Sequence, residues 1–210
     1  MTGKGSLNHN SRKFHAKNTD PNRTHWNVEY CNEDIKDVYH ELFDDALKRY
    51  NDKQTRKDRK IDDYYEKIRS GKQEKLFHEV ILQIGDKDNM GSETMEGQLA
   101  AKILDEYMKG FQERNPTLRV FAAHLHLDEA TPHLHIDFIP YVTGSKRGLD
   151  TRVSLKQALS SLGFKGGSRS ETELNQWVQS EKQKLAMVMR ENEIEWDQKG
   201  THEQHLSVLD

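Results

Sequence analysis

Residues 124–140 constrain the fold more than any other part of the chain, because histidines recur in them at alternate positions. Alternate side chains of a β-strand lie on the same face of the sheet. Two sets of polar side chains therefore share a face: His124, His126 and Asp128 before a turn, and His133, His135 and Asp137 after it. The intervening residues are rich in turn formers, so we predict two adjacent strands with their imidazoles side by side.

A single His-x-His pair on a strand is often only a polar surface that faces solvent. Two pairs that face each other favour a metal site instead. The only cysteine is Cys31, which excludes a structural zinc site built from cysteines within one chain. Three neutral imidazoles with an open coordination position are typical of a catalytic metal site. Such nitrogen and oxygen ligands suit manganese, magnesium, zinc or another first-row ion.

Three motifs, in this order along the chain, resemble those of the Mob/Pre plasmid mobilisation and recombination proteins, the MobV-type relaxases. Residues 9–12, HNSR, resemble the family's HNxR motif, and residues 20–27, DPNRTHWN, resemble the NPxRxHxN stretch that follows it. Residues 126–135, HLDEATPHLH, resemble the HxDExxPHxH signature. The resemblance covers residues 6–141 and is specific, because it rests on three separated motifs in the right order.

The resemblance implies the HUH endonuclease fold, an α+β fold with an antiparallel sheet and helices packed on its faces. It implies that His126, His133 and His135 hold a divalent metal, with Mn²⁺ expected and Mg²⁺ or another first-row ion as alternatives. It also makes His9 the nucleophile, a role open to an imidazole near neutral pH because its ordinary pKa is about 6.5. Glu129 is expected to orient His9 or a metal ligand, the alternative being a turn carboxylate that faces solvent.

Contacts with DNA are expected from the two N-terminal motifs. Arg12 could bind a phosphate through two hydrogen bonds, unless it is a simple surface arginine. Lys13 and Arg23 belong to a basic cluster around the first motif, although such clusters are usually solvated faces. His25 and Asn27 share a face of a predicted strand, where they could line the DNA site or have a structural role.

Two assignments stay open. His124 shares a strand face with His126 but precedes the family signature, so it is either a spare histidine or a group that supports the ligands. Most HUH enzymes use tyrosine as the nucleophile, and the alternative to His9 is therefore Tyr30, on a strand expected to adjoin the metal site. Tyr50, Tyr64 and Tyr65 are weaker alternatives.

Composition permits this interpretation without requiring it. The formal net charge of −3 is a point against DNA binding, because strong nucleic-acid binders often carry excess positive charge. We predict a relaxase domain over residues 1–200 and a flexible end over 201–210, in either a whole protein or the N-terminal domain of a longer one. The chain has one cysteine, no apolar run of membrane-spanning length and no hydrophobic core of a signal peptide. These features predict a bacterial cytoplasmic protein.

Hydrophobic periodicity predicts the secondary structure. Strands are expected over residues 25–30, 76–84, 118–127 and 133–142. Helices are expected over residues 33–50, 53–75, 93–114, 154–162 and 170–193. The absence of a Walker motif and of a dinucleotide fingerprint argues against nucleotide-driven chemistry.

The predicted function is that of a relaxase that nicks one strand at a plasmid origin of transfer. It would keep the 5′ end as a phosphoramidate on His9 and release a 3′-hydroxyl. The expected partners are single-stranded or supercoiled origin DNA, with a conjugation coupling protein as a further candidate. The alternatives are a tyrosine-type rolling-circle replication initiator or transposase, a small-molecule metallohydrolase, and a DNA-binding module whose histidines are structural.

Overall fold

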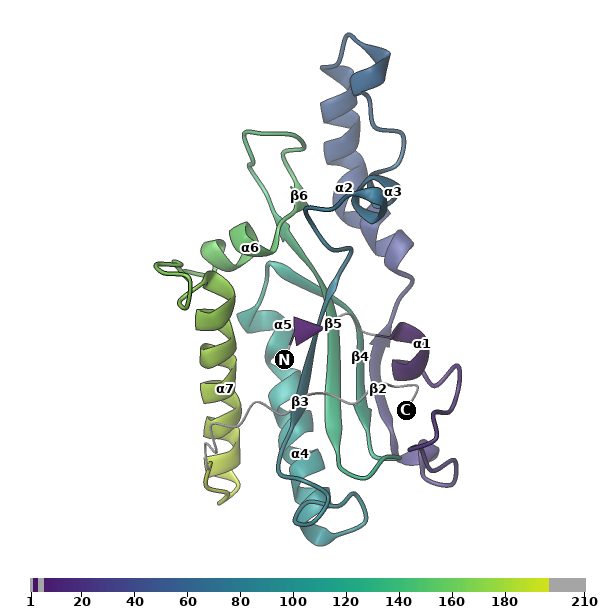
Figure 1. Cartoon of the computed structure of the whole chain (residues 1–210), viewed down its shortest axis with the longest axis vertical. Coiled ribbons are helices and arrows are strands. Elements are labelled where there is room, and N and C mark those ends of the chain that lie inside the picture. Colours follow the sequence, from purple (N-terminus) through teal and green to yellow (C-terminus); the bar gives the residue numbers. More distant parts are fainter. Residues whose placement is uncertain (1, 4–5, 197–210) are drawn as a thin grey trace.

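The structure, a computed structural model, describes residues 2–3 and 6–196, and an antiparallel sheet forms its centre (Figure 1). The strands follow the order β1-β3-β5-β4-β2, and β6 pairs with β5. Their bounds are β1 Thr2–Gly3, β2 Val28–Asn32, β3 His78–Gln83, β4 Leu118–His126, β5 His133–Val142 and β6 Arg152–Val153. The two predicted histidine strands, β4 and β5, are neighbours within this sheet.

The register between β4 and β5 brings the histidines together. His126 pairs with His133, and His124 pairs with His135. Because paired residues and alternate residues share a face, all four side chains leave the same face of the sheet. The sequence-based prediction of two facing pairs is confirmed.

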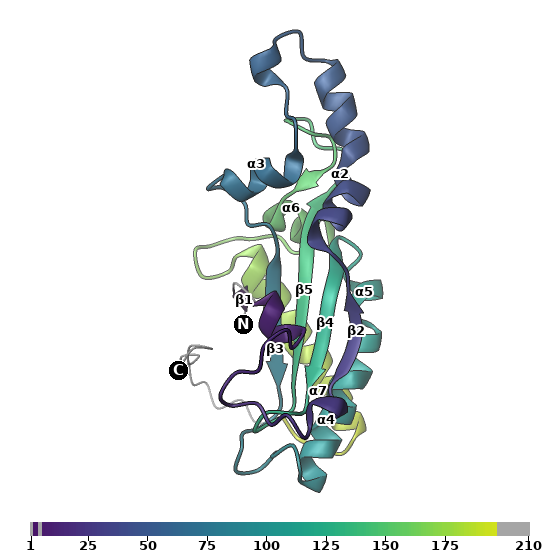
Figure 2. The ribbon, with the colours of Figure 1, turned by 90° about the vertical axis from the view of Figure 1, so that its right-hand side faces the viewer.

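Helices cover the opposite face of the sheet (Figure 2). They are α4 (Met95–Lys109), α5 (Phe111–Arg114), α6 (Leu155–Ser161) and α7 (Glu173–Glu191). The side chains that the strands turn toward them are apolar and include Val80, Leu82, Leu125, Leu134, Ile136 and Phe138. Thr94 and Thr172 begin α4 and α7 by accepting a hydrogen bond from a backbone N–H of the first turn.

Further helices lie on the histidine face. The short helix α1 (Leu7–Asn10) contacts β4, while α2 (Ile35–Asp52) and α3 (Tyr64–Ser70) lie at one end of the sheet (Figures 1 and 2). A register shift between Val120 and Ala122 interrupts the alternation of β4. It lets Phe121 join Phe43 and Ile139 in a second core under α2. Helices therefore pack on both faces, as predicted.

The predicted helix over residues 53–75 is wrong for most of its length. Only the 3-10 helix η2 (Lys57–Arg59) and α3 are helical there. Between them the chain folds back on α2: the side-chain amide of Asn51 donates to the carbonyl of Ile61 at 2.7 Å and accepts from its N–H at 2.9 Å. Ile61 and Tyr64 are buried in the second core, so tertiary packing outweighs the helical spacing of the apolar residues.

Other elements differ from prediction at their ends. The 3-10 helix η1 (Thr24–Trp26) replaces the first half of the strand predicted over residues 25–30. Gly110 separates α4 from α5 within the helix predicted over residues 93–114. Strands β1 and β6 have two residues each, too few to show an alternating pattern. The predicted flexible end at 201–210 lies outside the described residues. In the part of the chain that the structure describes, no helix has the length and apolar character to cross a membrane.

Candidate active site

Three imidazoles from β4 and β5 form a compact, buried cluster. The ring centroids of His126 and His135 lie 4.8 Å apart, those of His126 and His133 5.2 Å, and those of His133 and His135 5.0 Å. None of the three residues is more than 8% exposed. The structure thus brings the three predicted metal ligands to one point on the sheet.

Each of these imidazoles is fixed through one nitrogen, which leaves the other for a ligand. The contacts are His133 Nδ1 with the carbonyl oxygen of Thr131 at 2.9 Å, His135 Nδ1 with Oε1 of Glu79 at 2.7 Å, and His126 Nε2 with the carbonyl oxygen of Asn10 at 2.9 Å. Nδ1 of His126 and Nε2 of His135 are buried without a hydrogen-bond partner. Such atoms cost free energy unless a ligand binds them, and imidazoles oriented by outer hydrogen bonds are typical of metal sites. The residues present therefore fit a metal ion.

Two overlapping sets of side chains among the described residues could hold that ion. One is His9, His126 and His135, and the other is His126, Glu129 and His133; within each set the potential ligand atoms lie within 4.8 Å of one another. Both sets contain His126. They extend the predicted set by His9 and Glu129, and their nitrogen and oxygen atoms suit a first-row divalent ion.

Burial keeps two of these imidazoles, His126 and His133, neutral. It lowers the pKa of His133 to about 4, and it holds the pKa of His126 well below its usual range, with the neighbouring His135 and His133 adding to the effect. Metals bind the neutral form of histidine. The site can therefore take up a metal at neutral pH without first losing a proton from either group.

A bound metal should stabilise the folded protein. At a metal concentration a hundred times the dissociation constant, the free energy of unfolding should rise by about 2.7 kcal/mol. For a domain of this size that raises Tm by about 5–10 °C, which thermal melts with Mn²⁺ and then with added chelator would measure. Ca²⁺, which prefers oxygen ligands, should raise Tm less. An unchanged Tm with every first-row ion would count against the site.

His9 lies beside the cluster, in α1. Its ring centroid is 5.8 Å from that of His126 and 6.2 Å from that of His135, and its Nε2 lies 3.2 Å from Oε1 of Glu129. Burial by itself would raise the pKa of Glu129, but the hydrogen bond with His9 and the nearby His133 and Arg12 lower it to about 2. Glu129 is therefore ionised at neutral pH and contacts His9, as its predicted orienting role requires.

Arg12 is engaged inside the protein. Its guanidinium group contacts both carboxylate oxygens of Asp128, lies 2.8 Å from Oε1 of Glu129, and donates to the carbonyl of His9 at 3.0 Å. Its φ of 52° lies in the left-handed region, which few residues other than glycine adopt. This turn at the end of α1 points the Arg12 side chain back toward His9. The contacts favour a role in holding α1 against residues 127–132.

Replacing Arg12 should therefore destabilise the fold. Arg12→Ala leaves the carboxylate of Asp128, whose side chain has 0% exposure, without its cation, and breaking such a buried pair typically costs about 3–5 kcal/mol. Chemical denaturation would measure the loss. The matched control is Lys13→Ala, next in the sequence and exposed, which should change stability by less than about 0.5 kcal/mol. Equal stabilities would show that the ion pair contributes nothing.

The other predicted DNA contacts divide into two groups. Nη1 of Arg23 donates to the carbonyls of Leu127 and Glu129 at 3.0 and 3.2 Å, and Oδ1 of Asn27 accepts from the N–H of Leu127 at 2.7 Å. Both side chains thus bind the backbone of the turn between the histidine strands. Lys13 and His25 are exposed. The prediction that His25 and Asn27 share a strand face is wrong, because they lie in η1 and directly after it.

Two supporting residues were missed by sequence reasoning. Oε1 of Glu79 accepts from Nδ2 of Asn10 at 2.8 Å as well as contacting His135, and Nδ2 of Asn10 also donates to Asp137 at 3.0 Å. Burial and the nearby Glu79 raise the pKa of Asp137 to about 8. Asn10 lies within the first motif, although no role was assigned to it. The sequence held one signal for Glu79: it is an acidic residue within an apolar strand. Because a buried carboxylate is costly without a partner, its position indicated a partner in the fold.

His124 and Tyr30, the two open assignments, do not belong to the cluster of potential ligand atoms, although the ring centroid of His124 lies 6.2 Å from that of His126. Nε2 of His124 contacts Glu29 at 3.3 Å, and His124 belongs to neither set of potential ligands. The hydroxyl of Tyr30 donates to Asp105 on α4 at 2.8 Å. The prediction that Tyr30 adjoins the metal site is wrong: at a register shift of β2 between Glu29 and Cys31, its side chain packs against the core on the helix-covered face.

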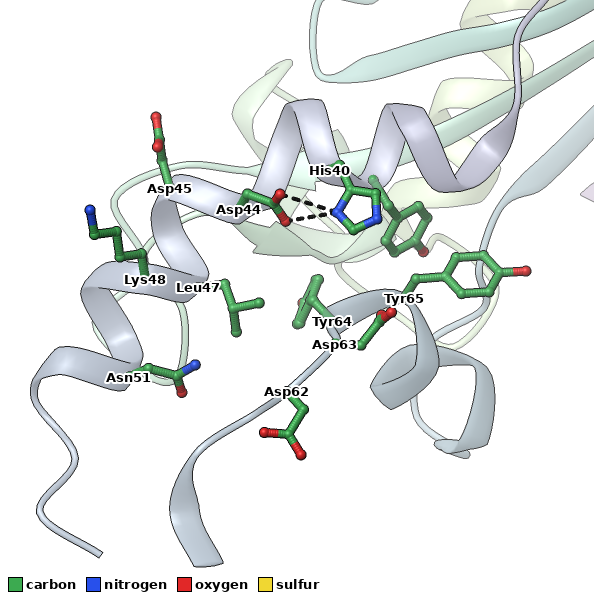
Figure 3. A pocket seen from close by; sticks show the side chains of 11 residues that line it. His40, Asp44, Asp45, Leu47, Lys48, Asn51, Asp62, Asp63, Tyr64 and Tyr65 are labelled. Atoms are coloured by element: carbon green, nitrogen blue, oxygen red, sulfur yellow. Dashed lines mark hydrogen bonds and ion pairs between the residues drawn. The ribbon is translucent and has the colours of Figure 1, made fainter. Parts of the chain in front are cut away.

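A pocket of about 430 Å³ lies elsewhere, between α2 and residues 62–65 (Figure 3). His40 and Asp44 contact each other at its rim, at 3.1 Å. Tyr64 and Tyr65, the weaker nucleophile alternatives, line this pocket, but none of the predicted metal or DNA-binding residues does. It is therefore separate from the histidine site.

An antiparallel sheet in which one strand presents the pair His133 and His135, and the neighbouring strand presents His126, to a common metal site is typical of the HUH endonucleases. The family model of the plasmid recombination enzymes, Mob/Pre, matches residues 5–197, and the chain belongs to this family. Two crystal structures of the MobM relaxase domain, bound to Mn and to 22 nucleotides of the oriT DNA of plasmid pMV158, are similar to the chain. Each has 23% identity and a TM-score of 0.52 over 96% of this chain and 87% of the other. At this identity the likeness shows the relaxase fold. No curated protein matches the chain.

Proposed function

We propose that the protein is a metal-dependent relaxase that nicks one strand at a plasmid origin of transfer and stays attached to the 5′ end. The reaction would serve conjugative mobilisation or plasmid recombination. The observation that supports this most is the 3.2 Å contact between His9 and Glu129 beside the buried imidazoles. The MobM relaxase domain was crystallised with oriT DNA and Mn, which supports the same substrate and metal for this member of the family.

The proposed metal is Mn²⁺, with Mg²⁺ or another first-row ion as alternatives. His126, His133 and His135 would hold it through the nitrogens that make no hydrogen bond to the outer partners. When bound, such a metal withdraws charge from a non-bridging oxygen of the scissile phosphate and stabilises the transition state. Glu79 fixes the orientation of one ligand, and the backbone of α1 fixes that of another.

His9 supplies the nucleophile in this proposal. When its proton is on Nε2, the ring donates to Glu129 and keeps a lone pair on Nδ1. Attack of Nδ1 on phosphorus forms a P–N bond and breaks the bond to the 3′ oxygen, which takes the electron pair. The Nε2 proton passes to the carboxylate of Glu129 and from there to the 3′ oxygen. The products are a phosphoramidate on His9 and a free 3′-hydroxyl, so the phosphoryl group stays available for rejoining.

Different parts of the N-terminal segment have different roles toward DNA. Lys13 and His25, which are exposed, are the proposed direct contacts. Arg12, Arg23 and Asn27 act by holding the segment on the turn between the histidine strands. A conjugation coupling protein is a proposed partner, and because plasmid DNA lies in the bacterial cytoplasm, we place the reaction there.

The alternative functions lack comparable support. A tyrosine-type initiator needs a tyrosine at the metal, and the hydroxyl of Tyr30 is bound to Asp105 on the other face of the sheet. A small-molecule metallohydrolase gives no reason for the three motifs or for membership of a plasmid recombination family.

The test is to incubate the protein with a supercoiled plasmid library and Mn²⁺ and to sequence the nicked ends. Nicks at one recurrent sequence, with protein on the 5′ side, are expected. Omission of the metal should abolish them. Random cleavage, or intact plasmids under all metal conditions, would contradict the proposed function.

A further inference from the structure

Phe14 is an exposed aromatic residue next to the proposed nucleophile. It is 40% exposed and belongs to neither hydrophobic core. Among the described residues its one ring contact is with His9, at 5.9 Å between centroids and 48° between planes. A single exposed apolar side chain is ordinary on a protein surface. This one contacts His9, the proposed nucleophile, and packs in neither core.

The backbone on both sides of Phe14 is fixed by hydrogen bonds. The N–H of Lys13 donates to the carbonyl of Asn8 at 2.9 Å, and the carbonyl of Ala16 accepts from the hydroxyl of Thr19 at 2.7 Å. Ala16 is buried. The ring is therefore presented at a defined place beside His9.

Two cations flank this ring. Lys13 and Lys17 are exposed, and no ion pair in the described part of the chain involves their side chains. Proteins that bind single-stranded nucleic acid combine such cations, which contact phosphates, with aromatic rings on which bases stack. Residues 13–17 present both features within one short loop.

We propose that Phe14 is a stacking platform for an unpaired base next to the scissile phosphate. The inference rests on the proposed function, because it takes His9 as the place where the phosphate reacts. A base held on the ring would limit the positions of the neighbouring phosphate and so favour attack by His9. Phe14 is thus a substrate-positioning residue, and since every base has a flat aromatic face, its contribution should tolerate different base identities.

The test compares two labelled single strands of equal length and charge: oligothymidine and an oligomer of abasic nucleotides. Stacking is worth about 1–3 kcal/mol per base, so Phe14→Ala should weaken binding of oligothymidine roughly 5- to 150-fold. It should leave binding of the abasic strand unchanged. Phe14→Trp should retain the affinity for oligothymidine, whereas Phe14→Leu, which lacks an aromatic face, should lose most of it.

Met187→Ala is the matched control, because this residue is 49% exposed. It lies on α7, which covers the face of the sheet opposite the histidines. This variant should alter binding of neither strand. An equal loss on both strands with Phe14→Ala would overturn the proposal, since the ring would then act on the backbone or on the fold. It would also be overturned if the parent protein bound both strands equally or bound neither.

Nicking of supercoiled plasmid by the parent protein separates this inference from the proposed function. If the protein distinguishes the two strands through Phe14 but does not nick plasmid, the stacking proposal is supported and the proposed relaxase reaction is contradicted. A protein that nicks but treats Phe14→Ala and the parent alike in the binding assay would contradict the stacking site alone.

Discussion

Replacing His9 with alanine is expected to abolish covalent attachment to plasmid DNA while metal binding and DNA binding persist. The substitution removes the attacking nitrogen but leaves the three strand histidines in place, so nicking should fall by roughly 10⁴-fold or more. Denaturing gels of the protein with labelled origin DNA would show the loss of the adduct. Metal titration of the same variant would show that the site survives. If His9→Ala loses metal as completely as a ligand variant, His9 belongs to the metal set that includes His126 and His135.

The adduct itself identifies the nucleophile. A phosphorus–nitrogen bond to histidine is hydrolysed in mild acid, whereas a phosphotyrosine ester survives it. Tyr30→Phe is the control. This variant should remain active, because the hydroxyl that it removes binds Asp105 on α4 and not the metal site. A 5′-linked complex that resists acid and disappears in Tyr30→Phe would assign the protein to the tyrosine branch of the fold.

The centre of the fold was predictable because its information is local. In β4 and β5 the alternation of polar and apolar residues sets both faces, and the short turn between them sets the pairing of His126 with His133. Alternation offered four histidines, and the resemblance to the Mob/Pre signature selected His126, His133 and His135 from them. The same rule does not place Tyr30, because the register of β2 shifts between Glu29 and Cys31. Its position follows from the hydrogen bond of its hydroxyl with Asp105 on α4.

The network around the imidazoles was not predictable, because its partners are far apart in sequence. Arg12 contacts Asp128 across 116 positions, and Asn10 contacts Glu79 across 69. Charge and motif membership favour a phosphate contact for Arg12, and only the folded chain shows that two buried carboxylates already bind it. The helix predicted over residues 53–75 was wrong for a related reason: the apolar residues at helical spacing there pack against α2.

Alanine at any of the three strand histidines should remove metal affinity and nicking together. A ligand substitution should cost more than the roughly 10- to 100-fold typical of an outer hydrogen-bonding partner, because each histidine is one of only three imidazoles on the proposed ion. Isothermal titration with Mn²⁺ and plasmid nicking would give the two values for His126→Ala, His133→Ala and His135→Ala. Melting curves without metal would separate loss of the site from loss of the fold.

Two variants at the edge of the site test which side chains complete the set. His124→Ala should affect metal binding least, because its imidazole faces Glu29 and lies outside both potential ligand sets. Glu79→Gln should produce an intermediate loss, since it weakens the acceptor that orients His135 without removing a ligand. A different result would move the site: if His124→Ala lost as much metal affinity as a ligand variant, and one of the three proposed ligands could be replaced without loss, the metal would lie nearer to His124, whose Nδ1 is also buried without a hydrogen-bond partner.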